Sequence, residues 1–347
     1  MFLVILALPA ISQQKEVNSP VKNFEKLWQT FNLRYANFEL KQVDWDEVYQ
    51  KYRPLVSHET TNEALFEICC LMLQELNDGH VSIIPDFTEA DIECGPPYEF
   101  KLAVAFQNSN ELQQFEAIMD KELVKNGFSE PIRPKVTEST NFQYRTSNEL
   151  GYLRLDEMTE EHTLGRFNRA LDEAISAFQN KKGIIIDLRF NGGGWDYSAY
   201  KLASRLISGS TKVGHFERTR ITGTSRYTEK KYRSIKPRGK LQFTQSIVIL
   251  TSDYTASAAE VFLLLMKDLP YVTLVGDHSE GIFSDVYEFK LPNNWEVGLS
   301  HQQFFSQDGT NYEGSGILPD IPVLNTKEDL ENKTDPVIAA AIKQLEK

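Results

Sequence analysis

The hydrophobic positions of the first eighty residues recur at helical spacing. Apolar side chains three and four residues apart fall on one face between Phe24 and Tyr35, which predicts an amphipathic helix. The stretches DWDEVYQKYRPLV (44–56) and TTNEALFEICCLMLQEL (60–76) predict two more helices. The third helix stops at the turn-forming residues Asn77, Asp78 and Gly79. We therefore expect a helical domain over residues 21–84, with His80 just past a helix end and leading into a short strand.

Residues 85–148 show a less regular pattern. FKLAVAF (100–106) resembles a strand, ELQQFEAIMDKELVKNGF (111–128) predicts a helix, and a polar connection follows. This part of the chain is interpreted as a connecting region that carries no chemistry.

From residue 149 onward, apolar strands alternate with amphipathic helices. The predicted elements, in chain order, are a strand in LGYLRL, a helix over 163–179, the strand GIIIDL (183–188), a helix over 196–208, the strands QSIVIL (245–250) and YVTLVG (271–276), and late strands at 286–291 and 295–300. Such alternation favours a mostly parallel sheet, with active groups outside the carboxyl ends of its strands. We expect an α/β domain over residues 149–330, followed by a C-terminal helix at 331–347.

The N-terminal segment MFLVILALPAISQQ combines a short apolar run with small residues. Ala10-Ile11-Ser12 resembles a signal-peptidase site, so residues 1–20 are predicted to be a signal segment and the protein to be exported. The alternative is a segment that packs on the domain. The run is shorter than the roughly 20 apolar residues that span a bilayer, so an integral membrane protein is not expected.

Charge and composition exclude several classes of function. The chain has 37 Lys and Arg against 49 Asp and Glu, a net charge of −12, and no basic cluster that would follow a nucleic-acid backbone. Its three cysteines, Cys69, Cys70 and Cys94, cannot make a disulfide framework and favour core packing over redox chemistry, and no Cys/His spacing indicates a zinc site. One stretch, residues 220–239, is locally basic. It is either a solvated surface hairpin or a region that steers acidic C-termini.

Two turns after buried strands carry candidate chemistry. In DLRFNGGGW (187–195), the amides of Gly192, Gly193 and Gly194 can approach a ligand closely, as an oxyanion hole requires. In LTSDYTASAAE (250–260), Ser257 stands where a helix begins and is either its N-cap or a nucleophile. A nucleophilic serine needs a base, for which His80 is the first candidate and His278 the second.

Five short motifs follow one another along the chain: LNDGH, IIIDLRFNGGG, TSDYTASAAE, VGDHSEGIFS and YEGSGILPDIPV. Together, over about residues 76–323, they resemble the C-terminal processing proteases, a family of serine peptidases, and specifically its tricorn-like branch. The resemblance implies a crotonase/ClpP-like β-α spiral as the catalytic domain. It also implies roles for individual residues: Ser257 as nucleophile, His80 as base, Glu313 as the carboxylate that supports the base, and the amides of Gly193 and Ala258 as the oxyanion hole.

The chain departs from the family pattern at two positions. Where the processing-protease branch has a lysine base after a glycine, Gly281 is followed by Ile282, so the resemblance implies the histidine of the tricorn-like branch. Tricorn usually has a serine directly before that histidine, whereas this chain has Gly79. No peptide-binding PDZ domain is evident between Asp86 and Leu150.

The function predicted from the sequence is a serine peptidase that cleaves unstructured peptides or proteins without a metal or cofactor. The first alternative is a non-catalytic module that binds lipophilic ligands or peptides on the same scaffold. A crotonase-type acyl-CoA enzyme is the second.

Overall fold

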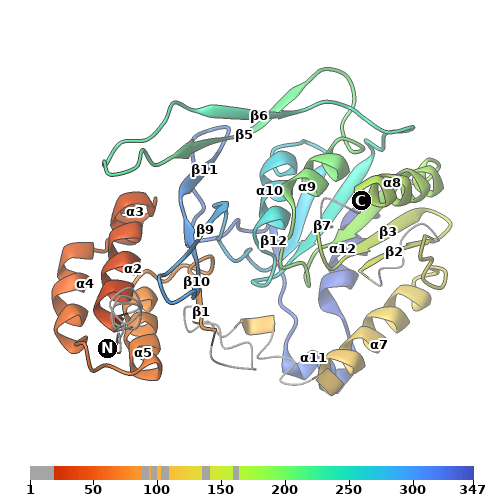
Figure 1. Cartoon of the computed structure of the whole chain (residues 1–347). Helices are drawn as coiled ribbons and strands as arrows, with labels where there is room; N and C mark the ends of the chain where they lie inside the picture. The colour runs from red at the N-terminus through yellow and green to blue at the C-terminus, as the bar shows by residue number, and fades with distance from the viewer. Residues whose placement is uncertain (1–18, 87–93, 95–99, 103–108, 135–140, 159–163) are drawn as a thin grey trace, which may run out of the picture. The chain divides into compact units, whose positions relative to one another are not determined.

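The computed structural model describes residues 19–86, 94, 100–102, 109–134, 141–158 and 164–347 (Figure 1). The chain divides into two compact units, each built from three segments. Unit 1 consists of Met1–Tyr98, Arg218–Lys230 and Ser284–Gln303, and unit 2 of Glu99–Glu217, Lys231–Phe283 and Phe304–Lys347. Residues 1–18 of the predicted signal segment lie outside the described residues. The predicted domain boundaries remain predictions.

Unit 1 contains the helices that the N-terminal periodicity predicts. They are α2 (Pro20–Arg34), α3 (Phe38–Lys41), α4 (Trp45–Tyr52), the 3₁₀ helix η1 (Arg53–Leu55) and α5 (Asn62–Gln74). Ser19, Asp44 and Thr61 cap α2, α4 and α5 by accepting hydrogen bonds from backbone amides of the first turn. The apolar faces of these helices form one buried cluster that includes Phe24, Phe31 and, from a later segment, Trp295.

A small antiparallel sheet completes unit 1. Its strand order is β1-β10-β9, with β1 at Ser82–Ile84, β9 at Val286–Lys290 and β10 at Glu296–Ser300. The short strand expected after His80 and both late strands are thereby confirmed. The sequence pattern did not indicate that they share a sheet, because some two hundred residues separate β1 from β9.

The centre of unit 2 is a six-stranded sheet with the order β12-β8-β7-β4-β3-β2. Its strands are β2 (Phe142–Thr146), β3 (Leu150–Leu155), β4 (Gly183–Asp187), β7 (Ser246–Thr251), β8 (Val272–Gly276) and β12 (Ile321–Pro322). Neighbouring strands run parallel except β2 and β3, which are antiparallel. The expected α/β class with a mostly parallel sheet is confirmed.

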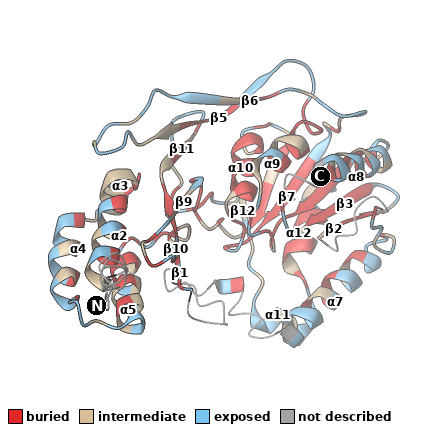
Figure 2. Cartoon of the chain, in the orientation of Figure 1, coloured by how far each residue is buried: buried red, intermediate tan, exposed pale blue. Residues whose placement is uncertain are grey.

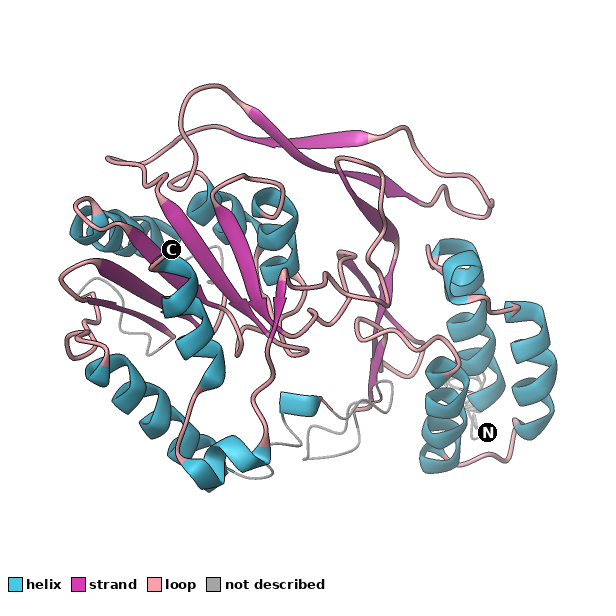
Figure 3. Ribbon diagram, turned by 180° about the vertical axis from the view of Figure 1, so that it is seen from behind, coloured by secondary structure: helices cyan, strands magenta, loops and turns pink. Residues whose placement is uncertain are grey.

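Helices cover both faces of this sheet, as Figures 1 and 3 show from opposite sides. One face packs against α8 (Leu164–Phe178), α9 (Asp196–Ala203) and α10 (Ala258–Met266), and the other against α7 (Ser109–Lys125) and α12 (Pro336–Leu345). Ile184 and Ile186 of β4 point into the first layer, while Ile185 points into the second. Figure 2 shows that the central strands are largely buried, and burial on both faces explains the continuous apolar runs of β4 and β7.

The remaining elements are β5 (Lys212–Thr219), β6 (Lys231–Ile235), β11 (Gln302–Ser306) and α11 (Lys327–Asn332). A third sheet has the strand order β11-β5-β6, and β5 pairs antiparallel with β6 as a hairpin. Helix α12 lies within the segment 331–347 that is expected to be a C-terminal helix. Among the helices that the structure describes, none reaches the length and hydrophobicity that a membrane-spanning segment needs. The cysteines are free thiols, with Cys69 and Cys94 buried, in agreement with a packing role.

Two predicted elements differ from the structure because of contacts between distant segments. Lys101 and Leu102 are helical rather than extended, and both of their amides donate to the carboxylate of Asp253. Residues 103–106 of the predicted strand lie outside the described residues. Helix α9 ends at Ala203 rather than residue 208. Beyond it, the carbonyl oxygens of Ser204 and Arg205 accept hydrogen bonds from the amides of residues 238 and 243 rather than from a continued helix.

A buried ionic network fixes the carboxyl end of β4. Arg189 donates to both carboxylate oxygens of Asp187, at 3.0 and 2.7 Å, and to those of Asp335, at 3.1 and 3.0 Å. Asp335 is also the N-cap of α12, so the network ties that helix to the sheet. Burial raises the pKa of Asp187, but the charge and hydrogen bonds of Arg189 outweigh this effect and leave the pKa below its ordinary value.

Replacing Arg189 with methionine is expected to lower the free energy of unfolding by about 3–5 kcal/mol, because two buried carboxylates lose their partner. Urea denaturation followed by circular dichroism would measure the change. Lys182→Met, which removes an exposed ion pair with Glu149, serves as the matched control and should cost less than about 1 kcal/mol. Equal losses in the two variants would contradict the assigned role of the network.

Candidate active site

The candidate site of unit 2 is built from the two loops that follow β4 and β7. These strands are parallel neighbours, so their loops leave the same edge of the sheet. The amide of Ala256 donates to the carbonyl oxygen of Asn191 at 3.0 Å, and the hydroxyl of Thr255 donates to that of Leu188 at 2.9 Å. The hydroxyl of Ser252 donates to the carbonyl oxygen of Arg189. Two hydroxyls and one backbone amide of the second loop therefore join it to the first.

Asn191 and Met158 contact the glycine turn, residues 192–194, and fix its conformation. The side-chain amide of Asn191 donates to the carbonyl oxygen of Leu155 at 3.0 Å, and its Oδ1 accepts from the Gly193 amide at 2.9 Å. Gly194 has φ +129°, and a Cβ there would lie 1.9 Å from the carbonyl oxygen of Met158. Only glycine fits at this position.

Ser257 occupies the N-cap position of α10 with an unusual backbone conformation. Its φ is 53° and its ψ is −119°, whereas an ordinary N-cap lies in the β region. A positive φ in a serine is strained, and such strain is found where the surrounding structure holds a residue for function. The conformation therefore argues against Ser257 being an ordinary cap.

The backbone of Gly193 lies directly against Ser257. A Cβ at Gly193 would be 2.6 Å from Cβ of Ser257 and 3.2 Å from the amide nitrogen of Ala258. The Ala258 amide belongs to the first turn of α10, where N–H groups lack partners within the helix. A hydroxyl, a glycine backbone and a helix N-terminus thus meet at one point, an arrangement able to attack a carbonyl carbon and stabilise the resulting oxyanion.

Glu260 holds the Ser257 backbone and a neighbouring loop together. It is fully buried, and its Oε2 accepts from the amides of Ser257 at 3.1 Å and Ile282 at 2.8 Å. Its Oε1 accepts from the hydroxyl of Ser279 at 2.6 Å and the amide of Gly281 at 2.7 Å. Burial raises the pKa of Glu260 to about 7, although all four hydrogen bonds stabilise the ionised form and lower it.

This pKa predicts a pH-dependent stability term. Between pH 4.5 and 7 the folded chain binds a proton at Glu260 that the unfolded chain does not, so the free energy of unfolding falls as pH rises through this window. The shift from 4.5 to about 7 corresponds to about 3 kcal/mol. Urea denaturation from pH 4 to 8 should show this decline in the wild type relative to Glu260→Gln, which carries no titratable group. A difference between the two that stays constant with pH would contradict the assignment.

Glu313 lies on the loop that packs against residues 279–283. It is buried, and its Oε2 accepts from the amide of Phe283 at 2.9 Å. The two loops are locked together because the Ile317 amide donates to the Ser279 hydroxyl at 2.8 Å and the Gly314 amide to the carbonyl oxygen of Gly281 at 2.7 Å. One loop thus connects Glu313 to Glu260, and through Glu260 to Ser257.

His80 belongs to unit 1, where Asp78 fixes the turn that carries it. The carboxylate of Asp78 accepts from the His80 amide at 2.9 Å, from the Tyr35 hydroxyl at 2.8 Å and from the Ser300 hydroxyl at 3.1 Å. Burial lowers the pKa of His80, against the charge of Asp78, a backbone hydrogen bond at Ser284 and the charge of Asp285, which raise it. An imidazole with a lowered pKa is neutral at pH 7 and can accept a proton.

His278, the second candidate base, has both ring nitrogens engaged within unit 2. Its Nδ1 lies 2.7 Å from the carbonyl oxygen of Ser279, and its Nε2 lies 3.3 Å from Nζ of Lys101. In the first contact Nδ1 donates its proton to the carbonyl oxygen, and Nε2 faces the lysine. These contacts favour a structural position for His278.

The structure thus brings three of the predicted site residues together, Ser257, Ala258 and Gly193, and places Gly194 against Met158. Gly192 and Gly194 are exposed, Gly193 is buried, and Gly192 lies beside Tyr254. Glu260 lies in the sequence motif of Ser257 but was not among the predicted site residues. The signal for it was present, because a serine followed three residues later by glutamate at a helix start is a capping-box pattern. Asp253, which binds the amides of Lys101 and Leu102, had no such signal.

Two family models match the chain. The model described as "Peptidase family S41" matches residues 149–323, just over half of the chain, and includes both loops of the candidate site. The model described as "Tricorn protease C1 domain" matches residues 18–74, the helical part of unit 1.

Individual relatives agree with these matches. A carboxy-terminal-processing protease of Bartonella bacilliformis is 28% identical over 183 residues, which are 52% of this chain and 40% of that protein. The chain thus spans about two fifths of that relative's length. A crystal structure of a candidate peptidase from Parabacteroides merdae has a TM-score of 0.77 and 26% identity, covering 94% of this chain and 97% of that one.

Mature CPAF bound to lactacystin shares the fold, with a TM-score of 0.66 and 12% identity over 95% of this chain and 98% of that one. The match of the family model to the segment that contains Ser257, the glycine turn and Glu313 leads to one conclusion. This chain belongs to peptidase family S41.

Proposed function

We propose that the chain is a serine peptidase that cleaves peptide bonds of unstructured peptides or proteins. The hydroxyl oxygen of Ser257 attacks the carbonyl carbon, His80 accepts the serine proton, and Glu313 orients the imidazole. The C–N bond then breaks as His80 passes the proton to the leaving amine. Water hydrolyses the remaining acyl-enzyme and restores the serine. The scheme requires no metal or organic cofactor.

The observation that carries the proposal is the strained Ser257 at the N-terminus of α10, packed against glycine backbone. An N-cap that served only the helix would need neither the positive φ nor a neighbour without a side chain. Membership of family S41 supplies the reaction class, and the carboxy-terminal-processing activity in the name of the Bartonella relative suggests substrates with free C-termini.

The oxyanion hole of the proposal consists of the Ala258 and Gly193 amides. Ala258 contributes a first-turn N–H close to Ser257. In the chain without substrate, the Gly193 amide donates to Oδ1 of Asn191. A substrate oxyanion would compete with this side chain for the same N–H group. Before substrate binds, the Asn191 side chain stabilises the conformation of the glycine turn.

Covalent labelling tests the proposal directly. A fluorophosphonate reagent should label the native wild type at Ser257, identified by peptide mapping with mass spectrometry. Ser257→Ala should not react, and protein unfolded in urea before addition should not react either. Labelling that persists in Ser257→Ala would contradict the proposal that Ser257 is the nucleophile. No labelling together with saturable uptake of an apolar ligand would favour the non-catalytic binding module instead.

A further inference from the structure

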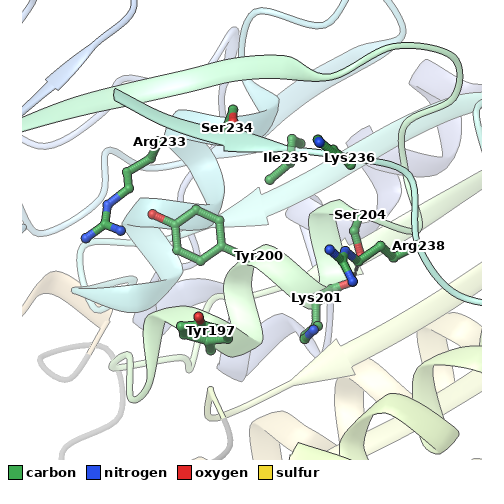
Figure 4. A pocket seen from close by; sticks show the side chains of 9 residues that line it. All are labelled: Tyr197, Tyr200, Lys201, Ser204, Arg233, Ser234, Ile235, Lys236 and Arg238. Carbon is green, nitrogen blue, oxygen red and sulfur yellow. Dashed lines mark hydrogen bonds between the residues drawn. The ribbon is translucent and has the colours of Figure 1, made fainter. Parts of the chain in front are cut away.

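Unit 2 contains a cavity of about 430 Å³ between α9 and the end of the β5–β6 hairpin, which we name the basic pocket (Figure 4). Its size lies within the range of ligand-binding sites, about 300–1,000 Å³. Its lining comes from α9 and the residue after it and from β6 with the segment that follows: Tyr197, Tyr200, Lys201, Ser204, Arg233, Ser234, Ile235, Lys236 and Arg238.

The basic pocket concentrates positive charge in an acidic chain. It is lined by four cationic side chains and no carboxylate, although the whole chain has a net charge of −12. Arg233 is paired with Glu217 at 2.6 Å. Across the described part of the chain, no carboxylate lies within ion-pair distance of Lys201, Lys236 or Arg238. These three cations leave a positive potential that an anion would neutralise.

The cations of the basic pocket repel one another. Burial lowers the pKa of Lys201, and the charges of Arg238 and Arg205 lower it further. Arg205 is compensated by Asp172 at 3.1 Å, whereas Arg238 is not compensated in this way. A carboxylate bound between Lys201 and Arg238 would relieve the repulsion, so the pocket favours an anionic occupant.

Aromatic rings form a fixed wall beside these charges. The Tyr200 hydroxyl lies 3.1 Å from Nε2 of the buried His215, which anchors that ring. Tyr197 stacks on Trp195 with ring centroids 4.9 Å apart. Tyr197 and Lys201 stand four residues apart on α9 and therefore share one face of the helix. The pocket thus offers apolar surface for the aliphatic part of an acidic side chain and positive charge for its carboxylate.

The position of the basic pocket in the sequence ties it to the candidate active site. Tyr197 follows Gly194 by only three residues, so their Cα atoms are at most about 11 Å apart. An extended peptide that contacts the glycine turn covers that distance with three or four residues, because a strand rises about 3.3 Å per residue. A peptide segment three or four residues from the cleaved bond can therefore reach Tyr197, which lines the pocket.

We propose that the basic pocket binds carboxylate side chains of the peptide substrate, a few residues from the cleaved bond, and so selects acidic segments. The inference rests on the proposed peptidase function for the identity of the ligand. It assigns a role to the end of the locally basic stretch, residues 220–239. The compact pocket, which provides no extended basic track, favours an acidic peptide over a nucleic-acid backbone.

The test compares two quenched fluorescent peptides that differ only in a Glu-Asp-Glu or Gln-Asn-Gln segment beside the cleaved bond. We expect the wild type to favour the acidic peptide by about tenfold in kcat/KM, since two partly exposed ion pairs each add a factor of a few. The double variant Lys201→Gln/Arg238→Gln should bring the ratio to within about twofold of one. The control Lys182→Gln/Lys343→Gln removes the same charge from exposed positions elsewhere and should keep the preference.

A binding measurement separates this inference from the peptidase proposal. Fluorescence anisotropy with Ser257→Ala and the same labelled peptides reports binding without turnover. A preference for the acidic peptide that is lost in the triple variant Ser257→Ala/Lys201→Gln/Arg238→Gln supports the pocket, even if the wild type cleaves nothing and the peptidase proposal fails. Equal cleavage and equal binding of both peptides would overturn the pocket while leaving the peptidase intact. Inorganic phosphate that binds more tightly than the acidic peptide would also overturn it, because the pocket would then be a site for small oxyanions.

Discussion

Ser257→Ala is expected to lower peptide cleavage by on the order of 10⁴- to 10⁶-fold, because the acyl-enzyme can no longer form. The fold should survive. The contact between Ser257 and Glu260 uses the serine backbone amide, which alanine retains, and the substitution adds no atom to the buried turn. Initial rates with a quenched fluorescent peptide would measure the loss, and thermal unfolding would confirm that the variant is folded.

Ser252→Ala is the matched control, because it removes a hydroxyl from the same loop. Ser252 is buried, its hydroxyl donates to the carbonyl oxygen of Arg189, and it accepts from the Tyr254 amide at 3.1 Å. Its loss should cost about 1 kcal/mol of stability and leave turnover within a few-fold. If Ser257→Ala kept wild-type rates, or if both variants lost activity equally, Ser257 would not be the nucleophile.

The sheet of unit 2 was predictable because its strands are buried on both faces. Ile184 and Ile186 pack in one helix layer and Ile185 packs in the other. A continuous apolar run of this kind indicates a strand that is buried on both faces. The glycine turn was equally legible, since Gly193 and Gly194 adopt φ angles of +107° and +129° that favour glycine. Both features depend on residues that are neighbours in the sequence, so the local pattern is sufficient to predict them.

Contacts between distant segments were not predictable in the same way. The hydrogen bonds of Glu260 to Ser279, Gly281 and Ile282 join residues about twenty positions apart. The periodicity of the sequence does not predict such contacts. The same holds for the early end of α9, where the carbonyl oxygens of Ser204 and Arg205 are taken by residues more than thirty positions later.

The composition of the basic pocket shows the same limit. The sequence pattern indicated that residues 220–239 are basic, but not that their end lies across from Lys201 on α9. Charge along a chain predicts a local potential. Whether that potential faces solvent or a cavity depends on tertiary packing, which brings Arg238 to Lys201 through the hydrogen bond of the Arg238 amide to the Ser204 carbonyl.

His80→Ala is expected to reduce kcat by on the order of 10⁴-fold, while His278→Ala stays within about tenfold of the wild type. A general base needs an unprotonated nitrogen, and the lowered pKa of His80 provides one at neutral pH. The nitrogens of His278 already contact Ser279 and Lys101. The double variant His80→Ala/Ser257→Ala should lose little more than either single variant, because a nucleophile and its base act as one unit.

The pH profile gives this prediction a second readout. Because burial lowers the pKa of His80, the acid limb of kcat/KM should have its midpoint below pH 6.5, the ordinary value for histidine. Activity would fall only as the imidazole becomes protonated below that pH. His58→Ala, which removes an exposed imidazole of unit 1, is the matched control and should leave the profile unchanged. Loss of activity in His278→Ala but not in His80→Ala would reverse the assignment and place the base within unit 2, on the same loop that binds Glu260.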